Sequence, residues 1–186
     1  MLLLVGLGNP GPKDINNRHN IGFRIIDAVN SHFKLSKQKP KFKGLLTTGL
    51  IGEHKVYAIK PLTFMNNSGT AIKELVDYFK IDAKDVIVFH DDLDIDFGKI
   101  KAKFAGSSAG HHGIDSIDKF IGKDYSRVRI GIGRPKTKAD VSDHVLKDFD
   151  EDEMIQLEKI TNNIINSMPI LLNKKLDLFS STVNNK

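Results

Sequence analysis

The alternation of short apolar runs with amphipathic helical periods is the feature that most constrains the fold of this chain. Residues 2–6 and 86–90 are short apolar runs, typical of strands that are buried on both faces. Apolar residues recur at helical spacing over about 20–33 and again over 72–79. Strands and helices that interleave in this way predict the α/β class, with a mainly parallel sheet.

A predicted hairpin makes this sheet a mixed one. Residues 45–51 and 56–60 read as two strands that are joined through Gly52 and Glu53. Further strands are expected at 99–104 and 127–132, and further helices at 114–121 and at 157–168, the latter ending or kinking before Pro169. No repeat or linker divides the chain, so we expect residues 1–186 to form a single domain. Its fold would be a twisted, mostly parallel mixed sheet flanked by helices.

In open sheets of this class, the functional site lies in the crevice at the C-terminal ends of the strands. This rule directs attention to the loops after Val5, Lys60, Phe89 and Ile132. The Lys-rich segment 34–43 is expected to be a loop. The polar tail of about ten residues at the C-terminus is expected to lack order.

Composition excludes several classes of protein and points to a polyanionic partner. The chain has no cysteine, which removes thiolate catalysis and Cys-based metal sites, and no apolar run approaches the ~20 residues that cross a bilayer. We therefore expect a cytoplasmic protein without a signal peptide or membrane contact, and nothing requires an oligomer. The net charge is +5. Basic residues cluster at 34–43, 99–103 and 127–138, which favours nucleic acid as the partner, although a merely solvated surface is the alternative.

The first motif imitates a dinucleotide-binding fingerprint. Gly6, Gly8 and Gly11 have the G-x-G-x-x-G spacing after a strand. That fingerprint requires a helix to begin within the glycines, whereas two prolines interrupt this loop and the helical period starts only near residue 20. NAD binding is therefore not expected. The loop is better interpreted as aiming Asn9 into the crevice, with glycines that allow a substrate to approach closely.

Two polar segments carry residue types suited to acid–base chemistry. His19 lies just before the first helix, and histidine is the common general base near neutral pH. Asp91, Asp92 and Asp94 follow a buried strand. Asp91 could hold His19 in its basic tautomer, the carboxylates could together bind Mg²⁺, or the acids could form a water-exposed turn. The residues alone leave these alternatives open.

Two further loops contain polar side chains before a helix. Asn66 can donate and accept hydrogen bonds, so it can bind a carbonyl group or orient a water molecule, whereas Asn67 and Ser68 can cap the helix. The loop 106–113 contains His111 and His112. Its backbone N–H groups could bind phosphate, and paired histidines suggest metal, although adjacent side chains point in different directions.

Taken together and in order, these motifs resemble the bacterial peptidyl-tRNA hydrolase family. The matching segments are VGLGNPG at 5–11, RHNIG at 18–22, KPLTFMNNSG at 60–69, HDDLD at 90–94, AGH at 109–111 and RVRIGIG at 127–133. The family cleaves the ester between a peptide and the 3′ end of tRNA and so recycles tRNA during translation quality control. An activated ester can be cleaved by a deprotonated water, so the resemblance implies neither a metal nor a cofactor.

The resemblance also implies catalytic roles for individual residues. His19 would be the general base and Asp91 its orienting partner. Asn66 would position the substrate and water and help to stabilise the oxyanion. Asn9 would recognise the first amide of the peptide, which spares unblocked aminoacyl-tRNA.

Further residues are implied in binding the CCA end and the acceptor stem of peptidyl-tRNA. Phe64 and Met65 would line the crevice beside the terminal nucleotides and the peptide, and His111 would be among the substrate contacts. Basic residues at positions that contact tRNA phosphates in the family are Lys101, Lys103 and Arg129.

The chain departs from the family pattern at two positions. His112 stands after the Gly-His111 pair, where the family usually has Asn, at a position that helps to hold the catalytic water and the tRNA 3′ end. Asp14 stands where the family tends to have Tyr. An acid at this substrate-contact position would repel phosphate and would lack the stacking surface of an aromatic ring. These departures are the support for a rival hypothesis, in which the scaffold binds RNA with weak or no hydrolysis.

Overall fold

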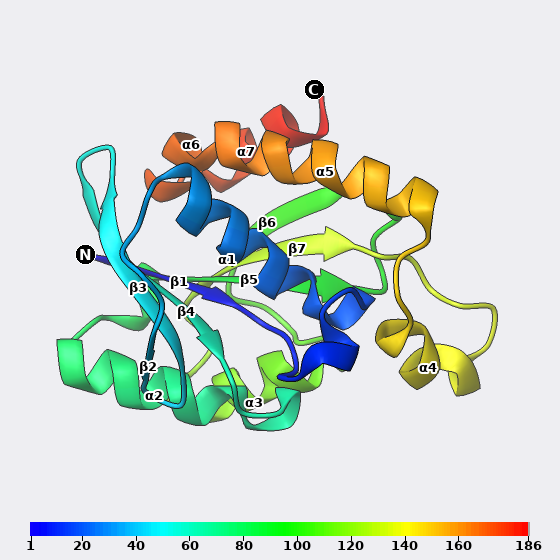
Figure 1. Cartoon of the computed structure of the whole chain (residues 1–186), viewed down its shortest axis with the longest axis horizontal. Helices are drawn as coiled ribbons and strands as arrows, with labels where there is room; N and C mark the ends of the chain where they lie inside the picture. The colour runs from blue at the N-terminus through cyan, green and yellow to red at the C-terminus, as the bar shows by residue number, and fades with distance from the viewer. Residues whose placement is uncertain (186) are drawn as a thin grey trace.

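Seven strands form one mixed sheet in the computed structural model, which describes residues 1–185 (Figure 1). The strand order is β2-β3-β4-β1-β5-β7-β6. The strands are β1 (Leu2–Gly6), β2 (Lys39–Lys41), β3 (Gly44–Ile51), β4 (His54–Pro61), β5 (Val86–Asp92), β6 (Ile100–Phe104) and β7 (Ser126–Gly131). The central four are parallel, while β2–β3, β3–β4 and β6–β7 pair antiparallel. The expected class, the hairpin and the mostly parallel sheet are confirmed.

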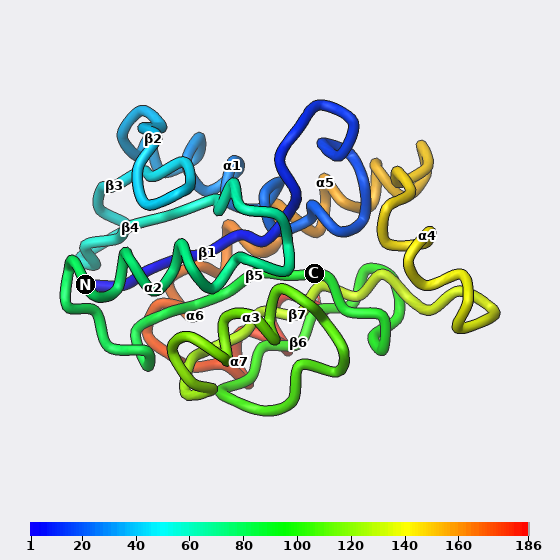
Figure 2. Tube along the Cα trace, turned by 90° about the horizontal axis from the view of Figure 1, so that it is seen from below, coloured from blue at the N-terminus to red at the C-terminus, as the bar shows by residue number. Residues whose placement is uncertain are grey.

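Helices cover both faces of the sheet, as Figure 1 and Figure 2 show from two directions. They are α1 (Ile21–His32), α2 (Ser68–Phe79), α3 (His112–Ile121), α4 (Val141–Leu146), α5 (Glu151–Asn166), α6 (Met168–Leu172) and α7 (Leu176–Asn184). Short 3-10 turns are η1 (Pro12–Asp14), η2 (Arg18–Asn20), η3 (Met65–Asn67), η4 (Ala83–Asp85) and η5 (Lys138–Asp140). Within residues 1–185, no helix is long and apolar enough to cross a membrane.

Alternate side chains of β1 enter two hydrophobic cores. Leu2 and Leu4 pack with α1, α5, α6 and α7, while Leu3 and Val5 pack with α2 and α3 on the other face. A buried parallel strand has this period-2 distribution with apolar residues on both sides. The two cores fix the helices against the sheet and so fix the loops at its C-terminal edge.

Glycines allow α1 to sit directly on the end of β1. A Cβ atom on Gly6 would lie 2.2 Å from the carbonyl oxygen of Gly22, and one on Gly22 would lie 2.3 Å from the backbone nitrogen of Leu7. A Cβ on Gly8 would collide with the Phe23 ring at 2.8 Å. Gly6 and Gly8 therefore accommodate α1, which corrects the expectation that they make room for a substrate.

Two segments expected to lack regular structure have it. Within the predicted loop 34–43, residues Lys39–Lys41 form β2 and pair with the start of β3. The C-terminal tail forms α7, which buries Phe179 and Val183, while Lys186 lies outside the described residues. The expected break before Pro169 is confirmed, because α5 ends at Asn166 and Pro169 lies in the first turn of α6.

Candidate active site

A cavity of about 480 Å³ opens at the C-terminal edge of the sheet. The loop after β1, the end of β5, the 108–112 loop and α4 surround it, as expected for the crevice of an open α/β sheet. The lining side chains with acid–base or amide chemistry are Asn9, His19, His90, Asp91, Asp92, His111 and His112. The structure thus brings together residues from four separate segments of the sequence.

His19 and Asp91 form the central pair of this cavity. The Nδ1 atom of His19 lies 2.9 and 3.0 Å from the two carboxylate oxygens of Asp91. The Asn17 side chain accepts a hydrogen bond from Asn20 N–H and so begins the η2 turn that carries His19, while β5 carries Asp91 to the sheet edge. A carboxylate only accepts, so Nδ1 of His19 carries the proton and donates. The Nε2 atom then keeps its lone pair, which is the form a general base requires.

The charges of this pair shift both pKa values. Burial by itself lowers the pKa of His19, but the charge and hydrogen bond of Asp91 outweigh burial, so the pKa is raised. Burial by itself raises the pKa of Asp91, but His19 and His111 outweigh it and lower the pKa. Asp91 is therefore an anion throughout the neutral range and stabilises the imidazolium form of His19.

His111 is a second hydrogen-bond donor to Asp91. Its Nε2 lies 2.9 Å from a carboxylate oxygen of Asp91. Its Nδ1 accepts the backbone N–H groups of Gly113 and Ile114 at the start of α3, which fixes the proton on Nε2. Both nitrogens of His111 are thus engaged, so this ring orients Asp91 and has no lone pair left for base catalysis. The sequence had placed His111 among the substrate contacts and did not indicate this bond.

His90 is buried and takes no part as a base. Its Nδ1 donates to the backbone oxygen of Asp91 at 2.7 Å, and its ring packs edge-to-face on that of His111 with centroids 4.9 Å apart. Burial first, and then the neighbouring His111, lowers the pKa of His90 to about 3. His90 is therefore neutral and supports the ring that contacts Asp91.

The carboxylates of the HDDLD segment do not converge on one point. Asp91 faces the two histidines, Asp92 lies 3.8 Å from Arg129, and Asp94 pairs with Arg134 at 2.6 Å. This divergence disfavours the Mg²⁺ interpretation, which needs several oxygen ligands around one ion. His19, Asp91 and His111 do place ligand atoms within 4.8 Å of one another. However, the Nε2 of His111 is protonated by the argument above and cannot ligate a metal without losing that proton.

Asn9 is held firmly at the cavity wall. Its backbone N–H and carbonyl both pair with the side chain of Asn20 at 2.9 Å, and its Oδ1 accepts the N–H of Met65 at 2.8 Å. The side-chain oxygen is therefore occupied, and among the described residues its Nδ2 donor has no hydrogen-bond partner. The sequence did not indicate that Asn20 holds Asn9, because a residue before a helix is most simply interpreted as a cap.

Asn66 and Phe64 flank Met65, which lines the cavity, but they are not among its lining residues. Asn66 is exposed in η3, and the Phe64 ring is 65% exposed. Met65, between them, is buried. The two exposed side chains are available to contact a substrate that is larger than the cavity itself.

A basic sheet face extends away from the cavity on β6 and β7. Lys101 lies opposite Arg129 and Lys103 opposite Arg127 in the antiparallel register, so the four side chains share one face. Arg127 is only 1% exposed and pairs with Asp118 of α3 at 2.9 Å, which removes it from the basic cluster expected from the sequence. Burial first, and then the neighbouring Arg129 and Arg127, lowers the pKa of Lys103.

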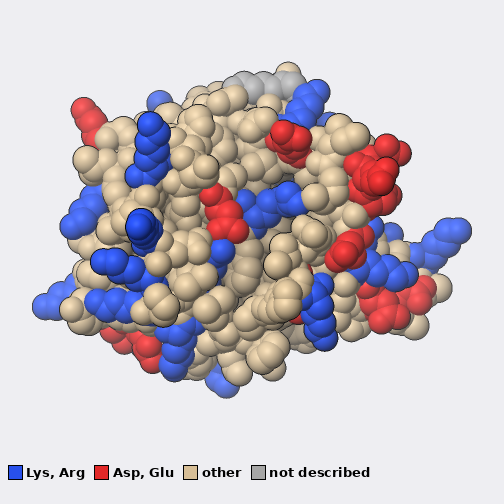
Figure 3. Space-filling model, in the orientation of Figure 1, with Lys and Arg blue, Asp and Glu red and all other residues tan. Residues whose placement is uncertain are grey.

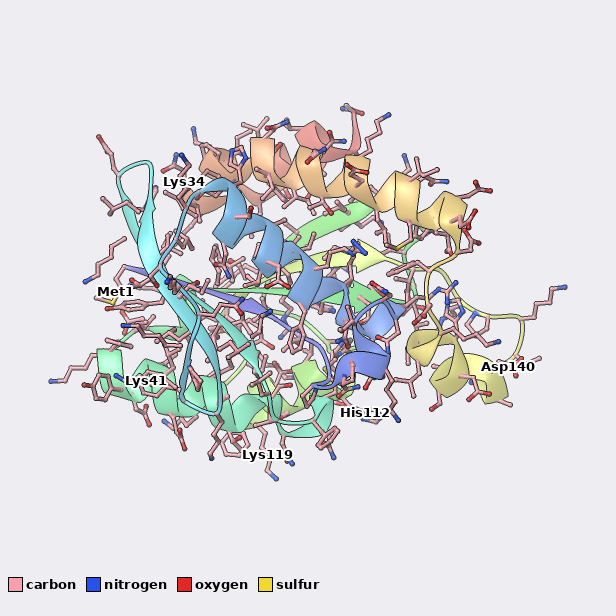
Figure 4. The ribbon with its side chains drawn as sticks, in the orientation of Figure 1. Met1, Lys34, Lys41, His112, Lys119 and Asp140 are labelled. Atoms are coloured by element: carbon pink, nitrogen blue, oxygen red, sulfur yellow. The ribbon has the colours of Figure 1, made fainter. Side chains whose placement is uncertain are left out.

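Charge is unevenly distributed over the rest of the surface. In Figure 3, lysines and arginines gather at the left, near β2 and the end of α2, and acids gather over α4 and the start of α5. Figure 4 places Lys34 and Lys41 on that basic side, Asp140 at the opposite end, and His112 between them.

The two departures from the family pattern have different environments. His112 is exposed at the first position of α3 and lines the cavity, and its contact with substrate stays a prediction. Asp14 is buried, and its Oδ1 accepts a hydrogen bond from Asn17 Nδ2 at 2.9 Å. The carboxylate of Asp14 is thus turned inward, where it holds the turn before His19, and its contact with tRNA stays a prediction.

A buried carboxylate, an imidazole with a free lone pair and an amide donor around one cavity are groups that can activate water, as hydrolases do. Comparison with known proteins agrees with this class. The family model described as peptidyl-tRNA hydrolase matches residues 3–186. The chain therefore belongs to the peptidyl-tRNA hydrolase family.

Relatives and solved structures support this membership over the whole chain. The peptidyl-tRNA hydrolase of Pelagibacter ubique is 82% identical over 100% of both chains. That of Ehrlichia ruminantium is 45% identical over 97% of this chain and 93% of its own. The crystal structure of peptidyl-tRNA hydrolase from Acinetobacter baumannii superposes with a TM-score of 0.93 at 32% identity, covering 99% of this chain and 94% of that one.

Proposed function

We propose that this protein hydrolyses the ester bond between peptide and tRNA in peptidyl-tRNA and so releases free tRNA during translation quality control. The observation that carries the proposal is the His19–Asp91 pair, 2.9 Å apart in a cavity at the sheet edge, in a chain of this family. The substrate is peptidyl-tRNA, and the chemistry is the addition of water to an ester.

His19 acts as the general base in this mechanism. Its Nε2 takes a proton from water as the oxygen attacks the ester carbonyl, and Asp91 stabilises the resulting imidazolium. The bond from the carbonyl carbon to the ribose oxygen then breaks, and His19 returns the proton to that oxygen. The products are a peptide carboxylate and a tRNA with a free 3′ hydroxyl. Such proton transfer contributes about 10²–10⁴-fold to the rate, and the Asn66 amide, beside the cavity, stabilises the oxyanion.

Substrate recognition rests on residues around the opening of the cavity. The free Nδ2 of Asn9 donates to the carbonyl oxygen of the first amide of the peptide, a group that an aminoacyl-tRNA with a free amino group lacks. The exposed Phe64 ring and His112 contact the CCA end. Lys101, Lys103 and Arg129, which share one sheet face, receive the phosphates of the acceptor stem. We further propose that the protein acts as a monomer in the cytoplasm. Light scattering of the purified protein tests the oligomeric state.

Hydrolysis of N-acetylated and of free aminoacyl-tRNA by the purified protein tests this function, with EDTA present throughout. Cleavage of the acetylated substrate alone is expected, because only this substrate supplies the blocked amide that Asn9 recognises and no metal takes part. Cleavage that requires added Mg²⁺ would overturn the mechanism. Binding of tRNA with no cleavage would replace it with the RNA-binding hypothesis.

A further inference from the structure

The helix α4 forms one wall of the catalytic cavity but stands apart from the body of the protein. Figure 1 shows it at the right, between the loop that leaves β7 and the start of α5. Val141, Ser142, Val145 and Leu146 line the cavity. None of the residues of α4 is fully buried, and Val145 alone packs partly against the hydrophobic core. The position of the helix therefore depends largely on polar contacts, one of which joins His144 Nε2 to the backbone oxygen of Gly133 at 3.0 Å.

Arg18 supplies several of these polar contacts. Its Nη1 lies 3.4 Å from the backbone oxygen of His144 and 3.2 Å from those of Lys147 and Asp148. Its Nη2 donates to Glu153 Oε1 at 2.9 Å. The backbone N–H of Arg18 also donates to the oxygen of Lys147 at 3.0 Å. One residue of η2 therefore binds the end of α4 and the start of α5 at the same time.

The chemistry of these contacts requires an arginine. The carbonyl groups at the end of a helix have no partner within it, so they need an external donor. A guanidinium group is a planar fork that can serve carbonyl oxygens on one side and a carboxylate on the other, whereas a lysine ammonium is a single point charge. The Arg18 side chain is 12% exposed and lies over the Phe149 ring at 5.5 Å. Water therefore replaces its hydrogen bonds poorly when they are lost.

Arg18 precedes His19 within the η2 turn, so the same turn carries the general base and the contacts to the cavity wall. Glu153 has a second partner as well, because its Oε1 also accepts the N–H of Asp150 in the capping box of α5. We propose that Arg18 is a positioning residue that holds α4 at a fixed place relative to His19 and thereby sets how tightly the substrate binds. This inference rests on the proposed function of the cavity.

Hydrogen exchange and steady-state kinetics of full-length Arg18→Lys test the proposal together. Backbone amides of residues 141–149 are expected to exchange faster, with unchanged exchange in β5 and α1. KM for N-acetylaminoacyl-tRNA is expected to rise about tenfold, with kcat within about threefold, because lysine cannot replace the hydrogen bonds of the guanidinium fork while His19 and Asp91 remain. The pH dependence of kcat is expected to stay in place, since neither partner of the base changes.

Arg24→Lys is the matched control. This arginine also contacts α5, through Met154 Sδ at 3.3 Å, and it lies on α1, outside the cavity. It is expected to leave both the exchange of 141–149 and KM unchanged. Glu153→Gln, which removes only the charge that faces Arg18, is expected to give part of the Arg18→Lys effect.

Unchanged exchange over residues 141–149 in Arg18→Lys would overturn the proposal, as would a fall in kcat with KM unaltered. If Arg18→Lys failed to fold, hydrogen exchange would be measured on Glu153→Gln instead. Unchanged exchange over residues 141–149 in that variant would then overturn the proposal. Exchange is measured without substrate, so it still tests the contact if hydrolysis itself is not observed. The failure of the positioning role and the failure of the proposed function are therefore distinguishable.

Discussion

Replacing Asp91 by asparagine removes the charge on which the proposed mechanism depends while nearly preserving side-chain shape. The Asp91 carboxylate is 2% exposed and accepts ring N–H groups from both His19 and His111 at 2.9 Å. The Oδ1 atom of Asp91 lies within hydrogen-bond distance of both rings, whereas Oδ2 contacts His19 alone, at 2.9 Å. An asparagine keeps one acceptor oxygen for the two rings and puts an NH₂ group in place of the other oxygen, which faces His19. His19 must then lose that bond or change its tautomer.

The size of the effect follows from which histidine is disturbed. If the asparagine NH₂ group faces His19, the proton of the ring moves to Nε2, and the base loses the lone pair that activates water. A wrong tautomer of this kind costs about 10⁴-fold in kcat, and loss of general-base assistance alone costs at least about 10²-fold. We therefore expect kcat to fall by about 10²–10⁴-fold, which corresponds to about 3–5 kcal/mol of transition-state stabilisation.

The pH dependence of kcat/KM provides the sharper readout. In the native protein the pKa of His19 is raised, and activity grows as pH rises through this value and the ring loses its proton. Asparagine removes the charge that raises the pKa, while burial, which lowers it, remains. The acidic limb of the profile is therefore expected to move to lower pH in Asp91→Asn.

The assay is hydrolysis of N-acetylaminoacyl-tRNA between acidic and neutral pH under single-turnover conditions. Asp92→Asn is the matched control, because it removes the same charge one residue away without a bond to His19. Its acidic limb is expected to stay in place. A limb that stays equally in place for Asp91→Asn, or a loss smaller than about tenfold in its rate, would refute the role of Asp91.

Three further predictions concern the tRNA-binding face, the buried arginine and the altered family position. Lys101→Ala with Lys103→Ala should weaken tRNA binding and flatten the slope of log Kd against log salt by about one unit per lost phosphate contact, measured by filter binding, and an unchanged slope would place the contact elsewhere. Arg127→Met should lower the free energy of unfolding by about 3–5 kcal/mol in urea melts, because Asp118 is left as an unpaired, mostly buried charge. A loss below about 1 kcal/mol would contradict that account. His112→Asn should raise kcat/KM by about two- to tenfold, which is the effect of one recovered hydrogen bond. No gain in kcat/KM would show that His112 holds the water and the tRNA 3′ end as well as an asparagine does.

The parts of the fold that were predicted from the sequence are those in which local pattern and burial agree. The helical period of apolar residues predicted α1 nearly to both ends and α2 from residue 72 to its C-terminal end, one turn short of its start at Ser68, because the residues that recur every turn are the ones that pack on the sheet. β2 was missed because it is a short strand of exposed residues. It is set by a turn with positive φ at Phe42 and Lys43, which the local residue types do not signal. Longer-range contacts decide such an element.

The C-terminal helix shows the same limit. The tail is mostly polar, yet α7 forms because Asn184 and Ser180 bond the free backbone groups of Ile100 and Ala102 on the edge strand β6. Phe179 is buried beneath it. Neither partner is visible near the tail in the sequence, so composition alone suggested a segment without order.

The candidate site was predicted as a set of residues and only partly as an arrangement. His19 and Asp91 are far apart in the chain, and residue types alone left their pairing open beside the Mg²⁺ interpretation. The bond of His111 to Asp91 depends on the capping geometry of α3, and the inward turn of Asp14 depends on Asn17. These contacts follow from backbone directions that no motif encodes.

The rate of hydrolysis by His19→Ala, measured together with its affinity for tRNA, tests the central claim most directly. The account predicts that single-turnover cleavage of N-acetylaminoacyl-tRNA is nearly abolished while tRNA binds with unchanged affinity. The reason is that His19 supplies the base, whereas the basic face lies on β6 and β7. Cleavage at more than about a tenth of the native rate would contradict it, since another group would then activate the water. An equal loss of cleavage and of binding would contradict it as well, by making His19 a structural residue.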